Sequence, residues 1–157
     1  KANTFYKKRF AQRAIKKEYR AFIRGAPNWS ATACDAPIAH ARDASRVRRT
    51  VHPDGREALT RFHCVRTEEG RADIACNPIT GRSHQIRVHL AHLGLPIIGD
   101  RLYGIQQDRA DPDEVRQRHA LHCKRLLFET FEGTSLEISA PIHADMQQLW
   151  SIEGVNP

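Results

Sequence analysis

Short extended segments that lie in pairs around turn signals most constrain the fold of this chain. Two such pairs have strand propensity on both sides of a Glu-Gly dipeptide. They are residues 59–65 with 72–76, and residues 121–130 with 135–140. Neighbouring strands joined by a short turn run antiparallel, so each pair predicts a β-hairpin. A further strand is predicted at 18–24, and Pro53-Asp54-Gly55 predicts a tight turn between two short strands.

Three helical stretches interrupt these strands at residues 2–16, 84–93 and 145–150. In the second, Ile86, Leu90 and Leu93 recur at three- and four-residue intervals. Ser83 is expected to cap this helix, and Gly94 is expected to end it in a left-handed conformation. Hairpins with a few helices predict an α+β domain whose mixed, largely antiparallel sheet has flanking helices.

The length of 157 residues suits one domain or part of one. A doubly wound nucleotide fold is disfavoured, because the sequence has neither common type of glycine-rich phosphate loop. ATP-dependent and dinucleotide-dependent activities therefore have no support. The sequence begins with lysine and an early basic stretch, so we expect that an upstream segment is missing.

Basic residues outnumber acidic ones by 25 to 18, which gives a formal net charge of +7. A field of this sign attracts polyanions, so nucleic acid is the first candidate partner and an anionic membrane surface is a further one. Two groups of basic residues are candidate contacts for RNA phosphates, the alternative being an ordinary solvated face. They are Arg42, Arg46, Arg48 and Arg49, and Lys7 and Lys8.

No apolar run approaches the roughly 20 residues that cross a bilayer, so no membrane span is expected. The four cysteines are widely separated and form no Cys-x-x-Cys pair, which argues against a zinc ribbon or a thioredoxin-like redox site. We expect them to be reduced, in a cytoplasmic protein or one of an organelle.

The most informative segment is TGRSHQIRVH at 80–89, followed by GLPIIGD at 94–100. Gly81 gives the backbone freedom just before the predicted helix, and Arg82 and Arg87 flank the helix start. A guanidinium can grip a carboxylate or phosphate with two parallel hydrogen bonds. This corner is therefore suited to bind an anion or to hold a carboxylate.

This segment closely resembles the signature of RluA-type RNA pseudouridine synthases. Further resemblance lies in KEYRA at 17–21, in the alternation at 58–62, in LHC at 121–123 and in the Ala-Pro ending at 140–141. The order and spacing agree across nearly the whole chain. The resemblance implies that the chain is the carboxy-terminal portion of one catalytic domain, spanning residues 1–157.

The resemblance implies isomerisation of uridine to pseudouridine in rRNA or tRNA, without a cofactor. Such an enzyme takes its target nucleotide out of the stack. Tyr19 matches the pocket tyrosine that contacts the base and is a candidate proton acceptor. Arg87 matches the arginine that pairs with the catalytic aspartate, and Leu121 matches an apolar wall of the pocket. Arg82 is expected to make a phosphate or structural contact.

One departure from the family pattern concerns the nucleophile. The family carries it in an H-R-L-D-x-x-T-S-G segment upstream of the K-x-Y strand, and the printed sequence contains no such segment. We therefore expect this chain alone to be inactive, with the aspartate upstream. The alternative is a non-catalytic RNA-binding or ribosome-associated module that keeps the fold. His119 and Cys123 are smaller departures, because the family more often has leucine and alanine there.

The histidines of the second helix invite a metal interpretation, since His89 and His92 lie three residues apart. The helix supplies no acidic ligand and lacks the His-Glu-x-x-His arrangement, so no metal site is predicted. Structural or RNA-facing roles are favoured instead. For Asp100, the last residue of the signature, we expect a role in stabilising a turn.

Overall fold

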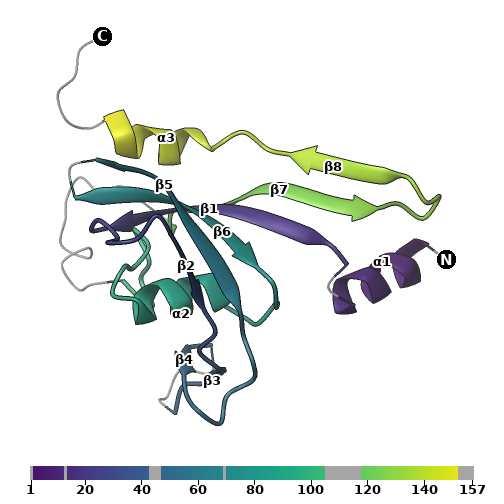
Figure 1. The fold of residues 1–157 in the computed structure, drawn as a ribbon, viewed down its shortest axis with the longest axis horizontal. Coiled ribbons are helices and arrows are strands. Elements are labelled where there is room, and N and C mark those ends of the chain that lie inside the picture. The colour runs from purple at the N-terminus through teal and green to yellow at the C-terminus, as the bar shows by residue number, and fades with distance from the viewer. Residues whose placement is uncertain (1, 13, 43–46, 69, 105–117, 152–157) are drawn as a thin grey trace.

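The computed structural model of this protein describes residues 2–12, 14–42, 47–68, 70–104 and 118–151. The helices are α1 (Ala2–Ala11), α2 (Gln85–His92) and α3 (Ala144–Ser151). The strands are β1 (Lys16–Arg24), β2 (Ala31–Cys34), β3 (Ile38–His40), β4 (Arg49–Val51), β5 (Thr60–Glu68), β6 (Arg71–Pro78), β7 (Leu121–Glu129) and β8 (Ser135–Ser139). Six strands form one sheet in the order β2-β5-β6-β1-β7-β8, and β3 pairs with β4 (Figure 1).

Every neighbouring pair of strands described here is antiparallel. The α+β class with a largely antiparallel sheet is therefore confirmed. Both predicted hairpins form, as β5–β6 and β7–β8, and their turns contain Gly70 and Gly133 at φ of 73° and 82°. Glycine adopts this left-handed backbone without the steric cost of a Cβ atom.

The predicted turn at Pro53-Asp54-Gly55 follows β4, but only a single bridge residue comes after it. Arg56 pairs with Ile38 in an isolated antiparallel bridge, so the expected second strand does not form there. Gly55 is required at this point, because a Cβ atom there would lie 2.7 Å from the backbone of Ile38. The turn thus closes the small β3–β4 sheet against its own first strand.

Strand β1 lies in the middle of the main sheet and carries the core. Tyr19, Ala21 and Ile23 share one face, as predicted from their period of two, and the last two are fully buried. Leu90 of α2 belongs to the same core cluster. Phe22, which alternates with these residues, is also buried, and Figure 1 shows α2 and α3 on opposite sides of the strands. Both faces of β1 are therefore covered near its carboxyl end.

The amino end of α2 differs from the prediction in its cap. The N-cap residue, immediately before Gln85, is His84, at φ 57° and ψ 17°, and no side chain caps the helix. The expected cap by Ser83 is therefore wrong, because a tight turn intervenes, in which the Gln85 N–H bonds the carbonyl of Arg82. At the other end the prediction is confirmed, since Gly94 has φ 74° and its N–H bonds the carbonyl of Ala91.

Helix α1 packs against the far end of the β7–β8 hairpin rather than against the rest of the sheet (Figure 1). Tyr6 meets Phe128 edge to face at 5.9 Å between ring centroids, and Arg9 pairs with Glu129. Within the described part of the chain, no helix combines the length and apolar character that crossing a bilayer would need.

Candidate functional site

A pocket of about 410 Å³ opens where β1, the start of β7 and the amino end of α2 meet. We call it the central pocket. Its wall includes all four residues predicted to contact a substrate, namely Tyr19, Arg82, Arg87 and Leu121. These residues are separated by up to 102 positions in the sequence, and only the sheet and α2 bring them together. This volume lies in the range of pockets that enclose small organic groups.

Arg87 projects from the first turns of α2 and is held by a carboxylate within the chain. Its Nε and Nη2 donate to the two oxygens of Asp100, each at 2.7 Å. The backbone N–H groups of Leu102 and Tyr103 also donate to Asp100, at 3.0 and 3.1 Å. The predicted turn-stabilising role of Asp100 is confirmed, and its pairing with Arg87 is an additional finding.

The Arg87–Asp100 pair is buried but stays ionised. The Asp100 side chain has no exposed surface, and that of Arg87 is 12% exposed. Burial alone raises the pKa of Asp100, but the hydrogen bonds and charge of Arg87 and the two backbone donors lower it below the ordinary value. Within the described residues, Nη1 of Arg87 has no hydrogen-bond partner, so one edge of the guanidinium is available for a second acceptor.

Tyr103 ties this ion pair to the β3–β4 sheet and to the start of α2. The Arg87 guanidinium lies 4.9 Å from the centroid of the Tyr103 ring, within the range of a cation–π contact. The Tyr103 hydroxyl accepts the N–H of Arg49 at 2.8 Å and lies 2.8 Å from Nδ1 of His84. Burial raises the pKa of Tyr103, so its hydroxyl keeps its proton.

A buried polar network holds the loop that leads into α2. The Gln85 side-chain oxygen accepts the Thr80 hydroxyl at 2.7 Å and the N–H of Arg82 at 2.9 Å. Its amide donates to Thr60, which also contacts Nδ1 of His89 at 2.9 Å. Each of these hydrogen bonds gives a partner to a buried polar group that would otherwise have none. The network thereby fixes the wall of the central pocket.

His89 belongs to this network and is a structural histidine. Its second ring nitrogen, Nε2, lies 3.0 Å from the carbonyl of Ala36, so both nitrogens are occupied. His92, three residues later, is exposed and lies along a different hollow. The alternative of a structural role, left open for this helix, therefore applies to His89.

We expect the stability of the fold to decrease as the pH falls from 7.5 to 5.5, partly because of His89. Burial lowers its pKa below the ordinary value, so the unfolded chain binds the proton more readily. The contribution is present above the unfolded pKa of about 6.5 and is lost as the pH falls towards the folded-state value. Urea unfolding at both pH values should show it, with a slope of at most about 1.4 kcal/mol per pH unit from this group.

The matched variants are His89→Gln and His92→Gln, on the same helix. The first should flatten the pH dependence of the free energy of unfolding, and the second should retain it. An equal pH dependence in the wild type and His89→Gln would contradict a neutral, buried His89.

Two further hollows continue from the central pocket across the basic side of the molecule. One, of about 370 Å³, is lined by Arg49, Arg56 and Arg82, with Asp54 as its single carboxylate among the described residues. The next, of about 520 Å³, is lined by Arg42, Arg48 and Arg49. Arg82 lines both the central pocket and the first hollow, and Arg49 lines both hollows. We call these two hollows the arginine groove.

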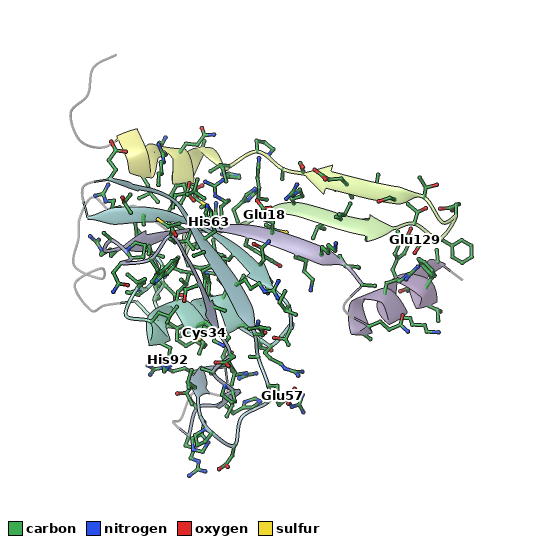
Figure 2. All side chains as sticks on the ribbon, in the orientation of Figure 1. Glu18, Cys34, Glu57, His63, His92 and Glu129 are labelled. Atoms are coloured by element: carbon green, nitrogen blue, oxygen red, sulfur yellow. The ribbon has the colours of Figure 1, made fainter. Side chains whose placement is uncertain are left out.

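The predicted phosphate contacts do not form one surface. Arg42, Arg48 and Arg49 lie along the arginine groove, and Arg46 lies outside the described residues. Lys7 and Lys8 are exposed on α1, at the end of the molecule where Figure 2 labels Glu129, and Glu57 near β3–β4 lies well away from it. The prediction grouped these residues because all carry a positive charge. The fold places the described arginines along the arginine groove and the lysines on α1, at another end of the molecule.

The central pocket also contains residues that were not among the predicted site residues. His84, His119 and Lys17 line it together with the four predicted residues. Burial, followed by the charge of Arg87, lowers the pKa of both His84 and His119, so two neutral imidazoles face the cavity. The sequence offered one signal for them, since all three lie in or beside the motifs that resemble the family signature.

Comparison with known proteins agrees with this geometry. A family model described as RNA pseudouridylate synthase matches residues 2–92. The ribosomal large subunit pseudouridine synthase D of Xanthomonas campestris is 38% identical over 160 residues, which cover 96% of this chain and 47% of that protein. An uncharacterised RNA pseudouridine synthase of Bacillus subtilis, YjbO, is 36% identical over 143 residues, which cover 90% of this chain and 47% of that protein.

A solved structure is similar as well. Human RNA Pseudouridylate Synthase Domain Containing 1 aligns with a TM-score of 0.76 and 26% identity, over 86% of this chain and 58% of that one. This chain spans about half the length of the curated relatives it matches. The match of the family model, the identity to these relatives and the shared fold agree, and the chain belongs to the RluA-type RNA pseudouridine synthase family.

Proposed function

We propose that the parent protein isomerises uridine to pseudouridine in rRNA or tRNA, and that this chain is the carboxy-terminal portion of its catalytic domain. The observation that carries the proposal is the central pocket, where Tyr19, Arg87 and Leu121 meet. A base taken out of the RNA stack needs an aromatic or apolar wall and a polar group that orients it.

In this proposal Tyr19 contacts the flipped base. Burial raises the pKa of Tyr19, with a further contribution from Cys123, so its hydroxyl is a neutral phenol at physiological pH. Leu121 supplies the apolar wall at the start of β7. The reaction breaks the bond from C1′ of the ribose to N1 of uracil, and the base turns. C5 then bonds to C1′ and loses its proton, and N1 carries a proton in the product. No cofactor takes part in this sequence.

Arg87 is proposed to position the nucleophilic aspartate, which a segment upstream of this chain would supply. Two of its donors are held by Asp100, Nη1 has no hydrogen-bond partner among the described residues, and Arg87 lines the central pocket. A guanidinium fixed in this way is pre-oriented, so it loses little freedom when a second carboxylate binds. Asp100 would then be a positioning residue that acts through Arg87.

The arginine groove is proposed to bind the RNA backbone beside the flipped nucleotide. Its arginines line two hollows that share Arg49, and Arg82 also lines the central pocket. The Nε of Arg82 donates to the carbonyl of Glu57 at 2.9 Å, which holds its side chain at the junction. Contacts of this kind position RNA without reading its sequence.

The test is release of tritium from C5 of uridine in RNA by the longest natural form of the parent protein. We expect release, and we expect Arg87→Lys to reduce its rate by at least about 100-fold. Lysine cannot bind Asp100 and the nucleophilic aspartate at once as a guanidinium does, and a small displacement of a catalytic group has an effect of this size. Arg118→Lys, in an exposed ion pair, is the matched control and should retain the rate.

Each outcome of this assay is informative. Release of tritium that Arg87→Lys leaves unchanged would remove Arg87 from the mechanism. RNA binding that weakens steeply with salt, without any release of tritium, would overturn the catalytic proposal and support the non-catalytic RNA-binding module.

A further inference from the structure

His84 has a left-handed backbone conformation, which residues other than glycine rarely adopt. Among the described residues it is the only one other than glycine with a positive φ, at 57°. Histidine is one of the few residues that adopt this region at modest cost, and such strain is retained where the surroundings fix it. In this conformation the imidazole does not cap α2, and His84 lines the wall of the central pocket.

The contacts of the Tyr103 hydroxyl favour one of the two positions for the proton on the His84 ring. That hydroxyl accepts the backbone N–H of Arg49, so its own proton needs a separate acceptor. Nδ1 of His84, at 2.8 Å, is its only other partner among the described residues. Both groups are satisfied when Tyr103 donates to an unprotonated Nδ1. The proton of the neutral imidazole then resides on Nε2.

Three neighbours, Tyr103, Arg87 and Arg49, keep the ring neutral and fixed. The ring of His84 packs edge-on against Tyr103 at 5.7 Å between centroids, so the imidazole does not rotate freely. The positive charges of Arg87 and Arg49 add to burial in lowering the pKa of His84. Nε2 has no hydrogen bond to the described residues and is not a buried unsatisfied atom, so it remains accessible to a ligand.

We propose that His84 is a base-recognition residue whose Nε2–H donates to the O4 atom of a uracil in the central pocket. This inference rests on the function proposed above. The O4 of uracil is an acceptor, whereas cytosine carries an amino group at the same position. A fixed donor therefore favours uracil and opposes cytosine, because two donors would face each other without an acceptor.

The tautomer can be measured first, on the full 157-residue chain with ¹⁵N-labelled histidine. Long-range ¹H–¹⁵N correlation spectra at pH 7.5 should show the His84 ring with the proton on Nε2, assigned by the loss of its signals in His84→Asn. A proton on Nδ1, or a charged ring at this pH, would overturn the inference whatever the RNA measurements show.

Base preference is measured next, by fluorescence anisotropy with two RNA oligonucleotides that differ only by a single uridine or cytidine. In His84→Asn, which suits a left-handed backbone but does not reach the position of Nε2, the preference for uridine should fall about tenfold. His84→Gln places an amide donor near that position and should retain the preference. His63→Asn, an exposed histidine on β5, is the matched control (Figure 2).

The outcomes separate the two proposals. RNA binding with a uridine preference within twofold of the wild type in His84→Asn would overturn the inference and leave the proposed function in place. Absence of RNA binding by the longest natural form of the parent protein would overturn the proposed function together with the inference. If His84→Asn does not fold, as judged by thermal unfolding, a lost preference in His84→Gln would overturn the inference.

Discussion

Replacing Asp100 with alanine will lower the free energy of unfolding by about 3–5 kcal/mol, the range for removing one partner of a buried ion pair. The change leaves the charge of Arg87 almost fully buried and without its two acceptors. It also removes the acceptor of two backbone N–H groups in the turn at 100–103. Urea or thermal unfolding of the purified chain measures the effect.

The matched control is Asp145→Ala, which removes an aspartate from the exposed pair with Arg118. Exposed pairs contribute about 0–1 kcal/mol, so this variant should unfold close to the wild type. A similar small effect for Asp100→Ala would contradict a buried, ionised pair.

The pH dependence of the Asp100 variant follows from the sign of the pKa shift. The pKa of Asp100 is lower in the folded state than in the unfolded chain, so its contribution is present above the unfolded value and is lost as the pH falls through the folded value. The difference in stability between the wild type and Asp100→Ala should therefore narrow in acid, below about pH 4. A constant difference across this range would mean that ionisation of Asp100 does not matter.

Leu90→Ala will lower the free energy of unfolding by about 3–5 kcal/mol, because it opens a cavity beneath α2. Leu90 is 0% exposed and belongs to the core cluster that joins α2 to β1 and β6. The same helix carries His84 at its start and Arg87 within it. Loss of this packing should therefore also displace His84 and Arg87 from their positions in the wall of the central pocket.

Leu136→Ala is the matched control, since Leu136 lies on the edge strand β8 and is 41% exposed. The same atoms are removed, but hardly any cavity forms, so the effect should stay within about 1 kcal/mol. Chemical denaturation at constant pH measures both variants. If the two variants unfolded at the same denaturant concentration, Leu90 would not be part of a packed core.

Both predictions depend on α2, and they separate two ways in which the fold holds the site. Asp100 fixes one side chain by electrostatics and hydrogen bonds, whereas Leu90 fixes the whole helix by packing. Measured under conditions in which both variants are folded, loss of RNA binding by Asp100→Ala alone would indicate a local effect on Arg87. Loss of RNA binding by Leu90→Ala as well would indicate displacement of α2.

Local patterns in the sequence determined most of the elements of this protein. Alternating apolar residues and Glu-Gly turns predicted β1 and both long hairpins, because strand periodicity and turn chemistry act over a few residues. Motif resemblance placed Tyr19, Arg82, Arg87 and Leu121 in one site, and they line one pocket. The roles of these residues remain predictions that the assays above test.

Only the tertiary structure decided which groups face one another across that pocket. The pairing of Arg87 with Asp100 and the link from His84 to Tyr103 join residues 13 and 19 positions apart through a turn whose path no local rule gives. The left-handed conformation of His84, which lies in the turn from Arg82 to Gln85 and contacts Tyr103, stands in place of the expected Ser83 cap. Local propensity acts through neighbours along the chain, whereas contacts between distant residues depend on how strands and helices pack in space.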